Sequence, residues 1–146
     1  MDLLPIYQTL TENRQFLGHP DCEPALQMSV DFFNRIGYDP PWNGYFVQLD
    51  GSIVGSAAFK GKPKNGRVEI AYGTVARYQN QGIGTQICQK LVELALATDS
   101  AVAITARTLP EENYSTRVLK KNGFEWQGMV WDEEDGDVWE WLYVKR

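Results

Sequence analysis

The stretch Gln79-Asn80-Gln81-Gly82-Ile83-Gly84 decides the fold of this chain. It follows a strand-like run at residues 68–72 and precedes a helix-like run at residues 85–97. A glycine-containing turn between a strand and a helix leaves backbone N–H groups free at the positive end of the helix dipole. Such a turn suits a phosphate or pyrophosphate group, and Gly82 and Gly84 allow the backbone to approach that group closely.

Two better-known phosphate-binding loops do not match this stretch. The dinucleotide-binding fingerprint requires G-x-G-x-x-G, and the Walker loop requires Gly-Lys followed by Ser or Thr. Residues 79–84 contain only G-x-G. The loop by itself is therefore as consistent with a plain structural turn as with an anion site.

The composition places the chain among soluble globular proteins and predicts one domain over residues 1–146. A formal net charge of -5 argues against nonspecific nucleic-acid binding, which needs a basic surface. Because no signal peptide and no membrane-spanning apolar run is seen, we expect a cytoplasmic protein without a membrane partner. Cys22 and Cys88 lack metal-ligand spacing, so we predict no metal site and expect Cys88 to be a buried free thiol.

Hydrophobic periodicity and turn residues predict the element order β-α-β-β-β-α-β-α-β-β. The predicted strands cover residues 1–10, 45–49, 53–59, 67–75, 101–108, 124–131 and 138–144. The predicted helices cover residues 21–37, 85–97 and 111–122, and Asp50-Gly51 marks a hairpin turn. Strands that come together first and then alternate with helices predict an α/β (α+β) fold, with a mixed sheet and helices on both faces.

This order of elements, with the glycine loop in that position, resembles the GCN5-related N-acetyltransferase (GNAT) superfamily. Residues 68–74 and 77–85 look like the fourth strand of the family and its Gln/Arg-x-x-Gly-x-Gly/Ala acetyl-CoA loop. Residues 108–110 and 113–124 resemble the branch that includes the ribosomal-protein N-terminal acetyltransferases, with its ending Asn-x-x-Ser-x-Arg-Val-Leu-x-Lys-x-Gly-Phe. The resemblance implies a mixed, mostly antiparallel sheet of about six to seven strands, flanked by helices on both faces.

The chain departs from the family pattern at three positions. Asn80 takes a position where a glycine is usual, and asparagine also adopts the left-handed backbone. Leu119 stands where many members carry a general-acid tyrosine. The family asparagine falls on Glu112, and Asn113 follows one residue later. The resemblance therefore carries over the cofactor loop more securely than the catalytic acid.

The resemblance implies acetyl-CoA as the co-substrate. Its pyrophosphate would bind the N–H groups of residues 79–85, and its pantetheine arm would pair with the strand backbone near Tyr72 and Thr74. Asn113 would hydrogen-bond the pantetheine or, alternatively, only cap a helix. The candidate cofactor-binding residues are Tyr72, Thr74, Gln79, Gln81, Gly82, Ile83, Gly84, Thr85 and Asn113.

Acetyl transfer needs a neutral amine. At pH 7 a lysine amine is neutral in about one molecule in a thousand, whereas an N-terminal amine is neutral in about one molecule in ten. Glu69, in the middle of a strand among apolar residues, is the candidate base, directly or through a water. The alternative for Glu69 is an ion pair with Arg67 or a lysine. Ser115 and Tyr114 are candidate proton donors to the departing CoA thiolate.

The predicted function is an acetyl-CoA-dependent N-acetyltransferase that acts on a primary amine. A peptide N-terminus is the favoured acceptor by the branch resemblance, followed by a small amine such as a polyamine, an amino acid or an antibiotic. The alternative is an acyl-CoA-binding sensor or scaffold without efficient catalysis. A third interpretation is a nucleotide-binding protein unrelated to CoA.

Three regions bear on the acceptor and on assembly. Trp42 and Tyr45 border the place where the acceptor of this family usually enters. The acidic segment 132–137 is expected to be a solvated hairpin turn or, alternatively, to attract a cationic acceptor. Strand edges near the C-terminus are compatible with a homodimer.

Overall fold

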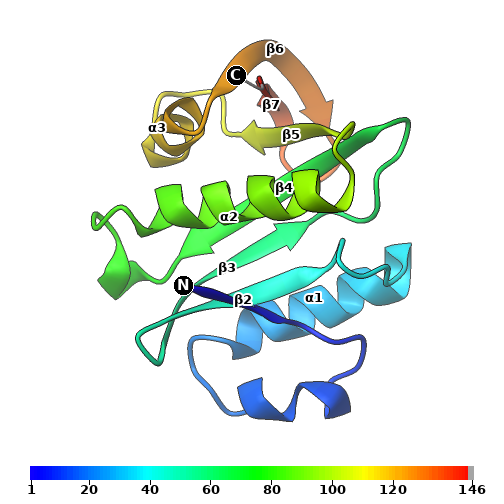
Figure 1. Cartoon of the computed structure of the whole chain (residues 1–146), viewed down its shortest axis with the longest axis vertical. Coiled ribbons are helices and arrows are strands. Elements are labelled where there is room, and N and C mark those ends of the chain that lie inside the picture. Colours follow the sequence, from blue (N-terminus) through cyan, green and yellow to red (C-terminus); the bar gives the residue numbers. More distant parts are fainter. Residues whose placement is uncertain (145–146) are drawn as a thin grey trace.

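The structure, a computed structural model, describes residues 1–144 and contains one seven-stranded sheet with helices on both faces (Figure 1). The strands are β1 (Asp2–Pro5), β2 (Gly44–Leu49), β3 (Ser52–Phe59), β4 (Arg67–Thr74), β5 (Ala103–Thr108), β6 (Phe124–Asp132) and β7 (Gly136–Tyr143). The helices are α1 (Glu23–Ile36), α2 (Ile83–Thr98) and α3 (Tyr114–Lys121), with 3-10 turns η1 (Thr11–Phe16) and η2 (Ala76–Tyr78). The predicted order of strands and α-helices is confirmed.

The strands lie in the order β1-β2-β3-β4-β5-β7-β6. All neighbouring strands run antiparallel except β4 and β5, which run parallel. The expected mixed, mostly antiparallel sheet is thus confirmed.

The first strand ends well before residue 10, where the sequence had predicted it to end. Pro5 is its last residue, and a buried asparagine then satisfies the following backbone. The Asn13 side chain accepts a hydrogen bond from the Tyr7 N–H at 2.7 Å and donates to the carbonyls of Tyr7 and Thr9. The backbone of residues 7–9 therefore needs no partner strand.

Helix α1 covers one face of the sheet. Pro24 lies in its first turn and Gly37, with φ of 105°, ends it, as the sequence predicted. Its buried side chains pack with those of η1 and the strands in one cluster: Ile6, Phe16, Cys22, Leu26, Phe33, Phe46 and Ile53. We call this group the α1-side core.

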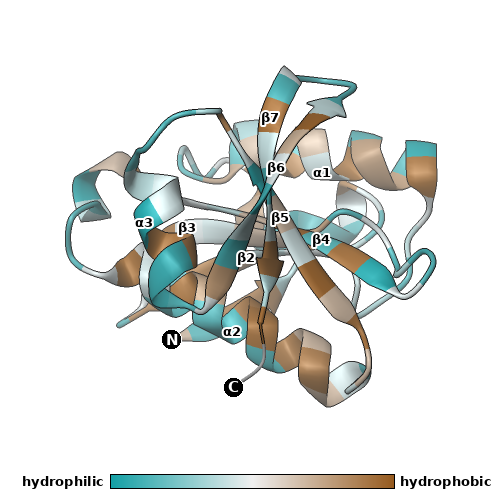
Figure 2. Cartoon of the chain, turned by 90° about the horizontal axis from the view of Figure 1, so that it is seen from above, coloured by the Kyte–Doolittle hydropathy of each residue, from teal (hydrophilic) through white to brown (hydrophobic). Residues whose placement is uncertain are grey.

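Helix α2 covers the opposite face, and Figure 2 shows the two helices on either side of the sheet. Successive residues of a strand point to opposite faces of the sheet. Phe46 therefore belongs to the α1-side core, whereas Tyr45 and Val47 belong to a second cluster on the α2 side. That cluster, the α2-side core, contains Ile83, Ile87, Leu91 and Ala95 from α2 and Val54, Val68, Ile70 and Ile104 from the strands. Helix α3 adds Val118 and Leu119.

Strands β4 and β5 pair over only part of their length. Their register runs from Arg67 opposite Ala103 to Ile70 opposite Ala106. Residues 71–74 of β4 are paired only with β3. The two strands therefore diverge after Ile70 and leave one side of β4 without a strand partner. We call this opening the β4–β5 gap.

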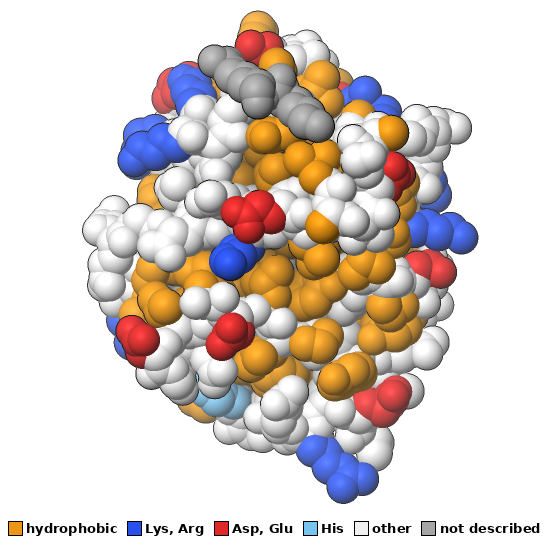
Figure 3. Space-filling view, in the orientation of Figure 1, with side chains coloured by type: hydrophobic (Ala, Val, Ile, Leu, Met, Phe, Trp, Pro, Cys, Tyr) orange, Lys and Arg blue, Asp and Glu red, His pale blue; other side chains and the backbone are white. Residues whose placement is uncertain are grey.

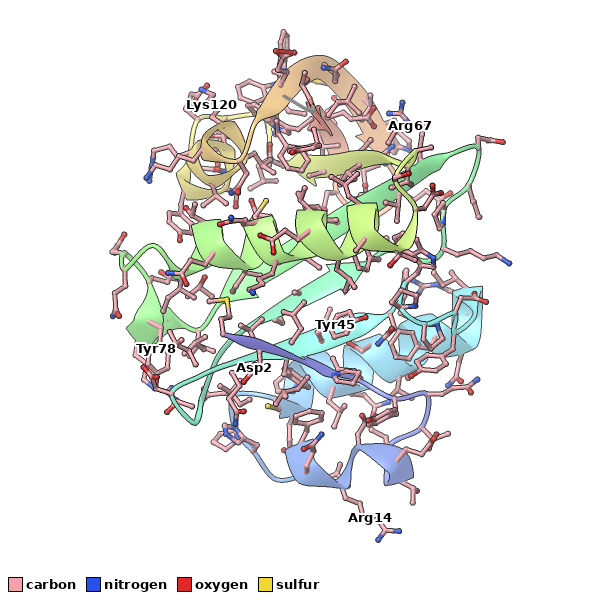
Figure 4. All side chains as sticks on the ribbon, viewed as in Figure 1. Asp2, Arg14, Tyr45, Arg67, Tyr78 and Lys120 are labelled. Atoms are coloured by element: carbon pink, nitrogen blue, oxygen red, sulfur yellow. The ribbon has the colours of Figure 1, made fainter. Side chains whose placement is uncertain are left out.

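The two ends of β4 have different surroundings. Figure 4 labels Arg67 at one end and Tyr78, just beyond the other end, at the start of the glycine loop. Strand β4 is paired with β5 at the Arg67 end and unpaired with it at the loop end.

No helix within residues 1–144 combines the length and the apolar character needed to cross a bilayer.

Candidate functional site

The free backbone of β4 points into the β4–β5 gap. On the β3 side, the Lys60 N–H donates to the Glu69 carbonyl and the Val75 N–H donates to the Val54 carbonyl, each at 2.8 Å. Because neighbouring residues of a strand face opposite sides, Tyr72 and Thr74 direct their backbone groups toward the gap. An extended ligand could pair with these groups as an added strand. Tyr72 and Thr74, whose backbone the sequence predicted to pair with a pantetheine arm, thus border the gap.

The glycine loop lies next to the end of the gap at which β4 and β5 are not paired. Gln79 donates from its side-chain Nε2 to the Thr74 carbonyl at 3.3 Å. Asn80 has φ of 64° and Gly82 has φ of 77°. Asparagine therefore provides the left-handed backbone at the position where a glycine is usual.

The start of α2 has no internal cap. Gly82 is its N-cap and offers no side chain, and the first N–H that bonds back into the loop is that of Gln86, to the Gly82 carbonyl at 3.2 Å. Among the described residues, the N–H groups of 81–85 have no hydrogen-bond acceptor. These N–H groups and the helix dipole form a ready anion cradle. Gln81, Gly82, Ile83, Gly84 and Thr85 are all part of it.

Two buried hydroxyls at this site have no hydrogen-bond partner within residues 1–144. They are Thr74 Oγ1, at the end of β4, and the Tyr114 hydroxyl, in the first turn of α3. A Cβ added at Gly84 would lie 2.5 Å from the Tyr114 hydroxyl, so Tyr114 rests directly against the start of α2. Buried polar groups without a partner are rare in proteins, and a ligand that supplies hydrogen bonds explains them. The residues present therefore fit a large polar ligand such as CoA.

Helix α3 starts later than predicted, at Tyr114 and not at residue 111, because Asn113 caps it. Asn113 Oδ1 accepts from the Thr116 N–H at 3.0 Å, and Thr116 Oγ1 accepts from the Asn113 N–H at 2.9 Å. This reciprocal arrangement is a capping box, so the side-chain oxygen of Asn113 serves the helix. Ser115 follows in the first turn, where its carbonyl accepts a hydrogen bond from the Tyr72 hydroxyl at 3.4 Å.

The two other departures from the family pattern have clear structural consequences. Leu119 is 0% exposed and belongs to the α2-side core. Glu112 is exposed and forms an ion pair with Lys120 Nζ at 2.9 Å. Neither residue supplies a hydroxyl or an amide to the gap. Any proton donor must therefore come from another position.

Glu69 lies on the α1 side of the sheet, at the closed end of the gap. Its carboxylate is 3.3 Å from Lys60 Nζ and 3.9 Å from Arg107 Nε. Burial raises the pKa of the Glu69 carboxyl, while the positive charges of Lys60 and Arg107 oppose that rise. Of the ion-pair partners expected from the sequence, a lysine is present, whereas Arg67 pairs instead with Glu140 at 3.0 Å.

Arg107 organises a charged network that sequence reasoning missed. It lies 3.1 Å from Asp132 and 3.4 Å from Glu140. Asp132 is only 6% exposed, and its Oδ1 accepts the N–H groups of Glu134 and Asp135. The N–H of Glu134 is the main reason why the pKa of Asp132 is lowered, and Arg107 adds to the effect.

The expectation of a solvated acidic turn is therefore wrong for Asp132. The run Asp132-Glu133-Glu134 carries a local signal, because aspartate commonly caps the backbone two residues ahead. The role of Arg107 has no such signal, since its partners lie 25 to 38 positions away in the sequence.

A cavity of about 500 Å³ opens between α1 and the sheet. We call it the α1 cavity. Its lining includes Ala71 of β4 and Lys60, the partner of Glu69, as well as Tyr45. Trp42 instead packs edge-on against Phe59, with ring centroids 5.0 Å apart. Of the two aromatic residues expected near the acceptor entrance, only Tyr45 borders this cavity, and its side chain belongs to the α2-side core.

A family model for GNAT acetyltransferase domains matches residues 2–125. The chain belongs to the GNAT family. The resemblance seen in the sequence is thereby confirmed, and the matched region extends further toward the N-terminus than the motifs alone indicated.

Two curated relatives are uncharacterized N-acetyltransferases from bacilli. YjdG of Bacillus subtilis is 30% identical over 95 residues, which cover 64% of this chain and 54% of YjdG. The chain thus spans about half the length of that relative. The protein p20 of Bacillus licheniformis is 26% identical over 134 residues, which cover 86% of this chain and 75% of p20.

Solved structures of the GNAT family share the fold. The aminoglycoside acetyltransferase AAC(6')-Ib in complex with coenzyme A is 27% identical, with a TM-score of 0.60 over 70% of this chain and 66% of that one. RimL, the ribosomal L7/L12 alpha-N-protein acetyltransferase, is 18% identical, with a TM-score of 0.68 over 97% of this chain and 91% of RimL. The RimL likeness extends over nearly the whole chain and shows the common fold.

Proposed function

We propose that this GNAT protein is an acetyl-CoA-dependent N-acetyltransferase that transfers an acetyl group directly to a primary amine. The observation that carries the proposal is the β4–β5 gap, which ends at the uncapped N–H groups of residues 81–85. From Ile70 to Thr74 the strand extends about 13 Å at about 3.3 Å per residue. A pantetheine arm along β4 would connect a pyrophosphate on the loop with the closed end of the gap.

The cofactor-holding roles follow from this arrangement. The N–H groups of residues 81–85 and the Thr85 hydroxyl would bind the pyrophosphate, and the backbones of Tyr72 and Thr74 would pair with the pantetheine. The unpartnered hydroxyls of Thr74 and Tyr114 would gain partners from the bound CoA. Acetyl-CoA supplies an acetyl group on a thiol whose pKa is near 8.5, which is a fair leaving group.

Glu69 is our candidate base. It lies where the gap closes, and burial raises the pKa of its carboxyl above the ordinary value, which makes the carboxylate a stronger base. Lys60 opposes that rise and so helps to keep the carboxylate ionised. Glu69 would take the amine proton directly or through a water, and Ser115, in the first turn of α3, is the candidate group to return a proton to the thiolate.

An acyl-CoA-binding sensor remains the second candidate, because one specific observation favours it. Leu119 is fully buried where many family members carry a tyrosine. In a sensor, the loop would bind acyl-CoA without efficient transfer to any amine.

Binding and turnover measured side by side test the proposal. The purified protein is heated with acetyl-CoA, ATP or NAD, and CoA release is then followed with acetyl-CoA and a panel of primary amines. We expect a higher Tm with acetyl-CoA alone, and amine-dependent CoA release. Acetyl-CoA binding without release from any amine would support the sensor, and stabilisation by ATP or NAD but not acetyl-CoA would contradict both candidates.

Two further expectations belong to the same proposal. The unpaired, buried thiols of Cys22 and Cys88 support a reducing, cytoplasmic location. Among the described strands β6 pairs only with β7, and an edge strand of this kind is compatible with a homodimer. Sedimentation velocity would detect such a dimer as a species of twice the 16.6 kDa chain mass.

A further inference from the structure

The α1 cavity exists because small residues meet in one row across three strands. Gly44 of β2 is opposite Ala58 of β3, and Ala58 is opposite Ala71 of β4. All three line the cavity, and Ser56 lies beside them. The buried side chains of α1 support the helix against the sheet elsewhere, so the space above this row stays open.

Part of the wall opposite this floor is apolar. Helix α1 contributes Ala25, Met28 and Phe32 to the lining, and Met28 is 71% exposed at the opening. The volume of about 500 Å³ is that of a site for a small organic group. The lining also carries Ser29 and Ser56, and the charged side chains of Asp31, Arg35, Lys60 and Glu134.

Two of the four charged lining residues pair with one another, and a third pairs with Glu69. Arg35 lies 4.0 Å from Glu134 and 5.3 Å above the Phe32 ring, and Lys60 is paired with Glu69 at 3.3 Å. Asp31 accepts a hydrogen bond from Gln27 at 2.9 Å. A polyamine or an aminoglycoside needs several carboxylates to balance its charges, and this opening has two cations facing two anions on its lining.

We infer that the acceptor is a primary amine attached to an apolar group and carrying no more than one positive charge. This inference rests on the proposed acetyl transfer. The amine would lie at Ala71, which borders both the cavity and the β4–β5 gap, and the apolar group would lie between the small-residue row and Phe32. A free arylalkylamine and a peptide with a large apolar first residue share this chemistry.

A matched set of acceptors tests the inference by kcat/KM with saturating acetyl-CoA. The set contains phenethylamine, the tripeptides Phe-Ala-Ala and Gly-Ala-Ala, spermidine and kanamycin. Because burial of a phenyl group is strongly favourable, we expect kcat/KM for Phe-Ala-Ala to exceed that for Gly-Ala-Ala by about 30-fold or more, and equal values would overturn the inference. The better of phenethylamine and Phe-Ala-Ala identifies the source of the amine. A kcat/KM for spermidine or kanamycin that equals or exceeds both would overturn the inference while the acetyltransferase proposal stands.

A cavity-filling variant locates the acceptor. Ala58→Leu should lower kcat/KM for the phenyl-bearing acceptor about tenfold or more, with the KM for acetyl-CoA unchanged, because it fills the floor of the cavity. Ala101→Leu, at an exposed position outside the cavity, is the matched control. If Ala58→Leu does not fold, Met28→Glu at the exposed opening should weaken the phenyl-bearing acceptor and favour spermidine. Unchanged selectivity in the folded variants would overturn the inference.

Failure of the acetyltransferase proposal can be recognised separately. If no amine releases CoA, calorimetric titration of phenethylamine into the protein with bound CoA tests the cavity alone. Binding that is lost in Ala58→Leu but kept in Ala101→Leu would support an apolar amine site. Absence of binding to the unmodified protein would overturn it.

Discussion

At the residue scale, Glu69 joins the cavity and the gap, because it pairs with a cavity-lining lysine and lies on the strand that borders both. We expect Glu69→Gln to lower kcat by about 10²-fold or more, the usual size of a general-base contribution. The KM for acetyl-CoA should stay the same, since the phosphate loop is at the other end of β4 (Figure 4).

Glu140→Gln is the matched control for this variant, because Glu140 contacts Arg107 and Arg67 in the same network. An equal loss of kcat in Glu140→Gln would assign the effect to the network. Unchanged turnover in Glu69→Gln would exclude Glu69 as the base.

The pH dependence follows from the Glu69–Lys60 pair. Burial raises the pKa of Glu69, and the Lys60 charge opposes this rise. A base acts only when deprotonated, so Lys60→Met should raise the pKa further and move the acidic limb of the kcat/KM profile to higher pH. Lys60→Arg and the exposed Lys62→Met serve as controls. A limb that moves to lower pH, or does not move, would contradict the assignment.

The Tyr114 hydroxyl offers a third test at this scale. It is buried without a partner and lies against Gly84 in the cradle. Loss of one hydrogen bond is worth about 1 kcal/mol, so Tyr114→Phe should raise the KM for acetyl-CoA about fivefold if CoA takes that bond. Tyr7→Phe, on the N-terminal segment, is the control. An unchanged KM would show that the hydroxyl has no partner in the bound state.

At the scale of single elements, α3 depends on its cap. The helix has eight residues, and the Asn113–Thr116 capping box closes its start. Asn113→Ala should lower the free energy of unfolding by about 1 kcal/mol, whereas Asn113→Ser should retain most of it. Urea unfolding measures the change.

The KM for acetyl-CoA separates capping from cofactor binding at the same residue. If Asn113→Ser keeps the stability and also the KM, then Asn113 acts as a cap only. A raised KM at full stability would support the contact with pantetheine.

At the scale of the whole molecule, the two cores lie on opposite faces of one sheet. Cys22 belongs to the α1-side core and Cys88 to the α2-side core, and both are buried free thiols, as expected for Cys88. Burial raises the pKa of Cys22 to about 11 and that of Cys88 to about 12. Both thiols should therefore resist a disulfide reagent near neutral pH until the chain unfolds.

The single-thiol variants Cys22→Ala and Cys88→Ala test whether the chain unfolds as one domain. If residues 1–146 form one cooperative unit, both remaining thiols should become reactive at the same urea concentration. Faster reaction of Cys22 would show that the α1 side opens by itself.

The distribution of charged side chains over the surface is also a property of the whole molecule. On the face that carries α2, positive and negative side chains are scattered among hydrophobic and uncharged polar atoms (Figure 3). This mixed surface agrees with the modest net charge of -5 seen in the sequence.

The sequence by itself determined the features that depend on neighbouring residues. Asp50 and Gly51, with φ of 50° and 81°, form the predicted hairpin turn, and Asn80 adopts the predicted left-handed backbone. The glycine turn and the α2 periodicity were equally local, which is why the order of the elements could be predicted, whereas CoA binding by this loop stays a prediction from the family resemblance.

Only the tertiary structure decided the features that need distant residues. The Arg107 network, the row of Gly44, Ala58 and Ala71, and the contact of Tyr114 with Gly84 each join strands or helices far apart in the chain. Which side chains meet across neighbouring strands depends on the strand register, and the register follows from the packing of the whole sheet. The sequence thus indicated where the glycine turn lies, whereas the surroundings of Glu69 and the shape of the α1 cavity required the folded chain.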